Sequence, residues 1–281
     1  MERIKQAIDR ARAERGNAPT PPVKPEHAER HRDSPPQTSA KPVASDVVYW
    51  STKTIATDPE YLRTRRVLTD VVDDPAAGAY KVLRTHILQR MRANSWTTLG
   101  ITGTREGNGK TLTTINLGIS LAREVNQTVL LVDFDLRRPR LASYLVEEKL
   151  PGISDYLLGR VEVSDILFHP GFDRLVVLPG HESVLNSSEA LSSPTVVKLV
   201  EELRTRYPDR IILFDLPPLL VGDDVIAFAP IIDAVMLIVE EGQTTRADLR
   251  RAYELLSGQR IIGTVLNKAD PLSVSHVHGY Y

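Results

Sequence analysis

A glycine-rich loop between an apolar run and a helical pattern constrains the fold of this 281-residue chain more than any other feature. The loop runs from Gly103 to Thr111 and reads Gly-Thr-Arg-Glu-Gly-Asn-Gly-Lys-Thr. A turn of this kind directs several backbone N–H groups at one point, and the N-terminus of the following helix adds partial positive charge there. The pattern therefore predicts a phosphate-binding loop in which Lys110 reaches the β- and γ-phosphates and Thr111 Oγ1 ligates Mg²⁺.

The spacing of this loop is irregular. The strict pattern has a glycine six residues before the lysine, where this chain has Thr104. Gly107 and Gly109 still supply the tight part of the turn, so we expect the backbone amides of residues 107–109 to contact phosphate oxygens. The complete set of loop residues expected to bind the nucleotide cofactor is Arg105, Glu106, Gly107, Asn108, Gly109, Lys110, Thr111 and Leu112. An ordinary glycine-rich turn is the alternative, and the sequence downstream argues against it.

Two apolar runs further along the chain end in aspartate. Asp133 and Asp135 follow the run 129–132, and Asp215 follows the run 211–214. Ligands gather at the carboxyl ends of strands in an open parallel sheet, and a hard divalent cation takes oxygen ligands. We therefore expect Asp215 to anchor Mg²⁺ opposite Thr111.

From Ala79 onward, extended and helical patterns alternate. The extended runs are 96–102, 128–134, 174–178, 210–216, 233–239 and 260–266, and the main helical patterns are 79–94, 112–124, 194–206 and 245–256. Aliphatic strands separated by helices are typical of a parallel sheet that is covered on both faces. With right-handed crossovers, the pattern predicts a three-layer, doubly wound α/β domain of the P-loop NTPase type, with a mainly parallel sheet, over residues 79–270.

The segments outside this domain differ from it in composition. Apolar residues at helical spacing predict an amphipathic helix within residues 1–16. Residues 17–45 contain seven prolines and few large aliphatic side chains, which predicts a disordered linker. Residues 46–78 form a bridging segment with weak strand and helix signals, and residues 271–281 are expected to form a flexible tail.

Composition limits the classes of function. The chain has no cysteine, which excludes disulfides and thiolate chemistry, and its net charge of −1 provides no general attraction for nucleic acid or anionic lipid. Its apolar runs are far shorter than the ~20 residues of a membrane span, and the N-terminus lacks the apolar core of a signal peptide. We therefore expect a cytoplasmic protein that binds no nucleic acid, is not inserted in the membrane, and meets the membrane only through a partner.

These motifs together resemble the bacterial tyrosine kinases (BY-kinases), which are the autokinases of capsule and exopolysaccharide assembly. The most specific part is the run 130–139, Leu-Leu-Val-Asp-Phe-Asp-Leu-Arg-Arg-Pro, followed downstream by Asp215-Leu-Pro-Pro218. The segments 186–194 and 263–268 are also similar to the family, so the resemblance covers about residues 79–270. Residues 1–12 and Tyr49-Trp-Ser-Thr-Lys53 resemble the soluble, exosortase-associated branch.

The resemblance implies an ATP- and Mg²⁺-dependent protein-tyrosine autokinase that regulates polysaccharide polymerisation and export. It implies that Asp133 or Asp135 orients or deprotonates the acceptor hydroxyl beside Lys110, and that Asn267 contacts the nucleotide base. The implied metal residues are Thr111, Asp133 and Asp215, and the implied phosphoacceptors are Tyr280 and Tyr281. The family further implies a homo-oligomer that a membrane polysaccharide co-polymerase, or chain-length determinant protein, recruits to the inner face of the membrane.

Departures from the family pattern keep two other functions open. Asn108 stands where the family usually has Glu, Arg105 and Glu106 replace a small residue and proline, and the oligomerisation helix has Gly78 in place of its Glu. Arg105 also lies where partitioning ATPases carry a second lysine that reaches across a dimer; the alternative is a solvated side chain. The other functions are a ParA/MinD-like ATPase switch and an ATP-sensing regulatory subunit without transfer activity.

Overall fold

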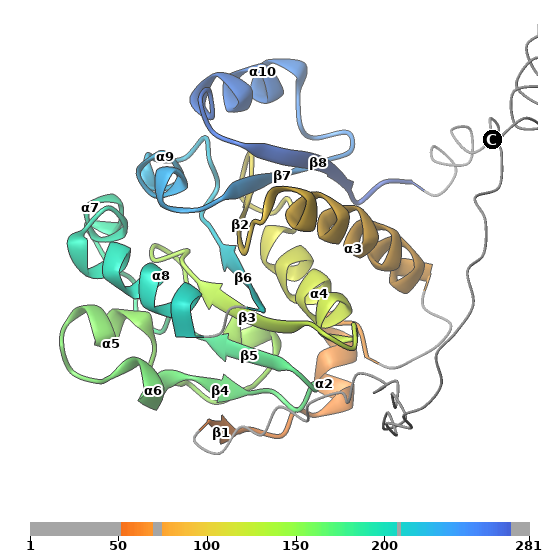
Figure 1. Ribbon diagram of the computed structural model, residues 1–281. Coiled ribbons are helices and arrows are strands. Elements are labelled where there is room, and N and C mark those ends of the chain that lie inside the picture. The colour runs from red at the N-terminus through yellow and green to blue at the C-terminus, as the bar shows by residue number, and fades with distance from the viewer. Residues whose placement is uncertain (1–51, 70–74, 207–208, 271–281) are drawn as a thin grey trace, which may run out of the picture. The chain divides into compact units, whose positions relative to one another are not determined.

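An eight-stranded sheet forms the centre of the described part of the chain (Figure 1). The computed structural model describes residues 52–69, 75–206 and 209–270. The expected N-terminal helix at 1–16, the Pro-rich linker at 17–45 and the tail at 271–281 lie outside the described residues. Within those residues, no helix combines the length and the apolar character that a membrane span requires.

The order of the strands across the sheet is β1-β4-β5-β3-β6-β2-β7-β8. Their bounds are β1 Lys53–Thr54, β2 Thr98–Gly103, β3 Thr128–Asp133, β4 Phe168–His169, β5 Leu175–Leu178, β6 Arg210–Asp215, β7 Ala234–Glu240 and β8 Ile261–Asn267. Neighbouring strands pair in parallel, except β4 and β5, which are antiparallel. The mainly parallel sheet is therefore confirmed, and the carboxyl ends of β2, β3 and β6 share one edge, where a ligand site is expected.

Helices cover both faces of the sheet. They are α2 Pro59–Thr64, α3 Pro75–Asn94, α4 Lys110–Ala122, α5 Ile153–Leu157, α6 Val163–Ile166, α7 Ser187–Leu191, α8 Pro194–Arg206, α9 Asp224–Phe228 and α10 Arg246–Leu255, with short 3-10 turns at Ala142–Tyr144 and Ala229–Ile231. Alternate strand residues enter two hydrophobic clusters, because side chains along a strand point to opposite faces. One cluster includes residues of α7, α8, α9 and α10, and the other includes residues of α2, α3 and α4. This arrangement confirms the three-layer α/β fold.

The domain begins earlier in the chain than the expected boundary at residue 79. β1 pairs in parallel with β4, and Leu62 of α2 is 3% exposed within the cluster under α3 and α4. The backbone N–H of Leu68 donates to Asn116 Oδ1 of α4 at 2.9 Å. The described part of the bridging segment is therefore packed on the domain. Its sequence signal is weak because β1 has two residues and α2 has six.

A glycine in α4 lets this helix approach the sheet closely. Gly118 faces Leu131 of β3, and a Cβ at position 118 would lie 2.5 Å from Leu131 Cδ2. Ten consecutive residues at the C-terminal end of α4, residues 113–122, are buried. The close contact fixes the distance of α4 from the sheet, and the N-terminus of this helix carries the phosphate-binding loop.

Candidate active site

The loop between β2 and α4 adopts the left-handed backbone that its glycines permit. Gly107 has a φ of 81° and Gly109 has a φ of 85°, a conformation that residues with a side chain rarely adopt. Gly109 also immediately precedes α4, and a Cβ there would lie 2.2 Å from Nδ2 of Asn267. The loop therefore keeps a tight turn even though Thr104 occupies the position of the first glycine in the strict pattern.

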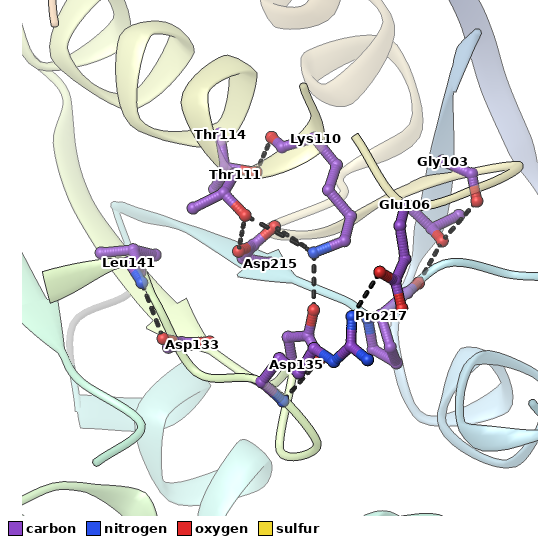
Figure 2. Close-up of polar contacts among 12 residues, drawn as sticks. Gly103, Glu106, Lys110, Thr111, Thr114, Asp133, Asp135, Leu141, Asp215 and Pro217 are labelled. Atoms are coloured by element: carbon purple, nitrogen blue, oxygen red, sulfur yellow. Dashed lines mark hydrogen bonds and ion pairs between the residues drawn. The ribbon is translucent and has the colours of Figure 1, made fainter. Parts of the chain in front are cut away.

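Lys110 and Thr111, the first residues of α4, meet two aspartates from the ends of β3 and β6 (Figure 2). Lys110 Nζ donates to Asp135 Oδ2 at 2.7 Å and lies 4.0 Å from Asp215 Oδ1. Thr111 Oγ1 donates to Asp215 Oδ2 at 2.7 Å. Asp215 Oδ1 is buried without a hydrogen-bond partner among the described residues. Because Mg²⁺ takes hard oxygen ligands, Thr111 and Asp215 fit the ion of a metal-bound nucleotide.

The site holds more negative than positive charge. Burial raises the pKa of Asp215 to about 6, although the Lys110 ammonium and the Thr111 hydroxyl act in the opposite direction. Burial and the neighbouring Asp215 raise the pKa of Asp133 well above its usual range. Burial by itself would lower the pKa of Lys110, but the charges of Asp215 and Asp135 outweigh it and raise that pKa. One ammonium therefore faces three carboxyl groups, and a bound cation would relieve their repulsion.

The two aspartates after β3 have different surroundings. Asp133 Oδ2 accepts from the backbone N–H of Leu141 at 2.9 Å, and Asp133 is 1% exposed (Figure 2). Asp133 lines a separate cavity of about 350 Å³, whereas Asp135 lines the same cavity as Lys110. The structure thus brings Asp135, rather than Asp133, into contact with the lysine. A catalytic or metal-binding role for Asp133 stays a prediction.

A cavity of about 320 Å³ opens beside the loop. It is lined by Glu106, Gly107, Gly109, Lys110, Thr111, Asp135, Arg137, Arg138, Arg140, Tyr144, Pro217, Pro218, Val221, Gly222 and Asp224. We call residues 106–111 the loop wall, and Arg137, Arg138 and Arg140 the arginine wall. Arg138 forms a close ion pair with Glu106, and this pair connects the two walls.

Arg137 holds the arginine wall to two helices. Its Nη2 lies 2.8 Å from Asp224 Oδ2 in α9, and its Nε donates to Ser187 Oγ in α7 at 3.0 Å. Gly222 makes room for this contact, because a Cβ there would lie 2.8 Å from Nη2 of Arg137. Asp224, Gly222 and Tyr144 line the cavity but carry no motif of their own. The one sequence signal for Asp224 is an acidic pair, 223–224, at a helix start.

Three residues that the sequence placed at the nucleotide make other contacts. The Arg105 guanidinium lies 2.8 Å from Asp248 Oδ1 in α10 and does not line the cavity, and the side chain of Leu112 packs against the core. Neither side chain therefore reaches the cavity: Arg105 is held by its ion pair with Asp248, and Leu112 is held by its packing in the core. Asn267 Nδ2 donates to the carbonyl oxygen of Asn108 at 2.8 Å, so it supports the loop directly.

Comparison with known proteins agrees with this geometry. The family model described as CobQ/CobB/MinD/ParA nucleotide binding domain matches residues 99–278. Tyrosine-protein kinase CpsD of Streptococcus pneumoniae serotype 4 is 31% identical over 194 residues, covering 68% of this chain and 83% of that protein. EpsB of Ralstonia solanacearum is 29% identical over 215 residues, covering 74% of this chain. This chain spans only 28% of the length of EpsB.

Solved kinase domains share the fold. The VpsO kinase domain has a TM-score of 0.62 at 30% identity, covering 69% of this chain and 97% of that domain. The kinase domain of the Escherichia coli tyrosine kinase ETK has a TM-score of 0.65 at 26% identity, covering 78% of this chain and 91% of that domain. The sheet, the loop and the aspartates at the strand ends define a P-loop nucleotide-binding domain. Within that class, the chain belongs to the bacterial tyrosine kinase family.

Proposed function

We propose that the chain is an ATP-dependent protein-tyrosine autokinase that regulates the polymerisation and export of an exopolysaccharide or capsule. The observation that carries the proposal is the meeting of Lys110, Thr111, Asp135 and Asp215 at a cavity whose opposite side presents arginines. The names of the relatives, which are tyrosine-protein kinases, support the same activity.

Phosphoryl transfer depends mainly on positioning and on neutralising charge. The backbone N–H groups of residues 107–109 bind the phosphates, and Lys110 exchanges its contact with Asp135 for the β- and γ-phosphate oxygens. Thr111 and Asp215 would hold Mg²⁺, which would neutralise phosphate charge when bound. Asp135 then orients or deprotonates the acceptor hydroxyl, with Asp133 as the alternative. A tyrosine hydroxyl has a pKa near 10, so a nearby carboxylate assists its loss of a proton.

The acceptors in this proposal are Tyr280 and Tyr281, which lie outside the described residues. The chain leaves β8 just after Asn267, beside the phosphate-binding loop, which makes in-line attack on its own γ-phosphate awkward. We therefore propose transfer between molecules of a homo-oligomer. We also propose that Asn267 lies near the nucleotide base. In the cell, a membrane polysaccharide co-polymerase recruits this cytoplasmic protein to the inner face of the membrane.

The test is to incubate purified protein with γ-labelled ATP and Mg²⁺ and to map any phosphotyrosine. At concentrations where the chains are still separate, transfer between molecules predicts an initial rate that rises with the square of protein concentration, and labelling of the Lys110→Ala chain when it is mixed with active protein. Undiminished phosphotyrosine in the Tyr280→Phe/Tyr281→Phe variant would refute the acceptor assignment. ATP hydrolysis without any phosphotyrosine would instead support the ATPase switch.

A further inference from the structure

The side chain of Asn108 points into the protein, although it lies between the two glycines of the phosphate-binding loop. Asn108 is 2% exposed, and its Oδ1 accepts from Thr104 Oγ1 at 3.0 Å and from the backbone N–H of Arg105 at 2.7 Å. Its Nδ2 donates to Glu240 Oε2 at 3.2 Å. The carboxamide thus uses both of its ends, and no other arrangement of this amide satisfies the same three partners.

Glu240 is the last residue of β7 and is itself held on its other side. Its Oε1 accepts from Lys268 Nζ at 2.9 Å, and its carboxylate is mostly buried, with 15% of the side chain exposed. The hydrogen bond from Lys268, together with that from Asn108, keeps the pKa of Glu240 below its usual range. Glu240 therefore behaves as a fixed anionic acceptor behind the loop.

The loop is also held from β8. Asn267 Nδ2 donates to the carbonyl oxygen of Asn108, and Asn267 lies opposite Glu240 in the β7–β8 pairing. Two neighbouring strand ends therefore grip the side chain and the backbone of one loop residue. Glu240 and Asn267 contact Asn108 on the side of the loop that faces the protein interior. A phosphate bound on the other side of the loop would therefore not displace these contacts.

We propose that Glu240 is a positioning residue for the phosphate-binding loop, acting through the side chain of Asn108. We call this pair the Asn108–Glu240 latch. The latch needs an amide at position 108 and a carboxylate at position 240. If both residues were carboxylates, neither could donate the hydrogen bond that joins them. The inference rests on nucleotide binding by the loop, and it does not depend on tyrosine transfer.

Three variants test the latch by reversing its polarity. Asn108→Asp places two carboxylates against each other, whereas Glu240→Gln, in either amide orientation, turns an N–H group toward Asn108 Nδ2 or toward Lys268. In Asn108→Asp/Glu240→Gln, the glutamine donates to the new aspartate and still accepts from Lys268. We expect each single variant to lose about tenfold in affinity, and the double variant to return to within about threefold of the parent.

The measurement is calorimetric titration of the full chain with ADP·Mg²⁺, with thermal unfolding of each variant alongside. Glu241→Gln is the matched control, because Glu241 accepts from the backbone N–H of Asp270 and does not contact the loop; its affinity should equal that of the parent. Parent-like affinity in both single variants, or a double variant as weak as either of them, would overturn the latch. If Asn108→Asp does not fold, recovery of affinity from Glu240→Gln to the double variant still decides the question.

A parent chain that binds ADP but produces no phosphotyrosine would overturn the kinase proposal and leave the latch standing. A parent chain that binds no ADP would overturn the latch together with the assignment of the loop. The two failures are therefore distinguishable in the same set of experiments.

Discussion

The loop wall and the arginine wall of the cavity are held in different ways. On the loop wall, Lys110 is 12% exposed at its side chain and Asn108 is buried, and both bind groups from other strands. On the arginine wall, the side chain of Arg137 is 42% exposed and that of Arg138 is 59% exposed. Exposed ion pairs contribute roughly 0–1 kcal/mol, whereas breaking a buried pair costs about 3–5 kcal/mol. We infer that the loop wall is formed before a ligand arrives, and that Arg137 is also held, by buried Asp224 and Ser187, while the exposed Arg138 exchanges partners.

The largest effect is expected when the lysine of the loop wall is removed, and this variant tests most strongly whether that wall binds the phosphates. Lys110→Ala deletes the charge at the β- and γ-phosphates, so we expect affinity for ATP·Mg²⁺ to fall by about 100-fold or more, together with any transfer. Calorimetry measures the binding, and Lys198→Ala, which removes an exposed lysine of α8, is the control for general loss of charge. Unchanged binding in Lys110→Ala would remove the phosphate-loop assignment.

The aspartates sharpen the comparison, because they separate metal anchoring from chemistry. Asp215→Asn should weaken Mg²⁺-dependent nucleotide binding by about tenfold, since it replaces the carboxylate that Thr111 contacts. Asp135→Asn, or Asp133→Asn if that residue is the base, should abolish transfer and retain more of the binding. The measurement pairs titration with ATP·Mg²⁺ and phosphotyrosine formation. Equal loss of binding in all three variants would contradict the division of roles.

The surplus of carboxyl groups around Lys110 predicts a pH dependence of stability. The pKa of Asp215 is about 6 in the fold and near 3.9 in an unfolded chain, so folding favours the protonated carboxyl. This contribution to stability is fully present below about pH 4 and is lost as pH rises through about 6. We expect Asp215→Asn, which resembles the protonated form, to be more stable than the parent at pH 7 by on the order of 1–3 kcal/mol.

Thermal unfolding of the two proteins without nucleotide, at several pH values, measures this difference. The gap between variant and parent should shrink toward pH 4, where the parent is also protonated. A gap that does not change with pH would show that Asp215 remains ionised in the fold. Glu182→Gln, an exposed acid away from Lys110, should produce no such trend.

The smallest effect is expected on the arginine wall. Arg138→Ala breaks the exposed pair with Glu106, so the free energy of unfolding should change by less than about 1 kcal/mol. Nucleotide affinity should fall about two- to fivefold, because Glu106 is left unpaired beside the phosphates, and Glu106→Gln/Arg138→Ala should recover it. A loss as large as that of Lys110→Ala would show that both walls are fixed alike.

Most of the fold could be predicted because its long elements carry strong periodic signals. The extended run 210–216 matches β6 closely, and the helix predicted at 194–206 has the same bounds in the structure. β1 and β4 could not be predicted, because two residues carry no periodicity and their pairing depends on segments more than 100 residues apart. For the same reason, the sequence predicts that the domain begins at residue 79, whereas β1 and α2, which precede that residue, are packed on the domain.

The site was predictable where a motif carries the chemistry. Lys110, Thr111 and Asp215 meet as the loop and strand ends imply, and the family prediction is confirmed. The inward direction of Asn108 could not be read from the loop, because its partner Glu240 is 132 residues away. The pairing of Arg105 with Asp248 likewise depends on where α10 packs, which local sequence does not specify.

Because Gly118 has no side chain, α4 lies close to Leu131 of the sheet, and this contact affects the position of the whole helix. The glycine lies seven residues after Thr111, which is about 10 Å along the helix. A helix is stiff over that length. A methyl group added at position 118 would therefore push α4 away from Leu131 and also displace its N-terminus, which carries the phosphate-binding loop. We infer that the missing Cβ at position 118, about two helical turns from Thr111, helps to set where the N-terminus of α4 lies against the sheet.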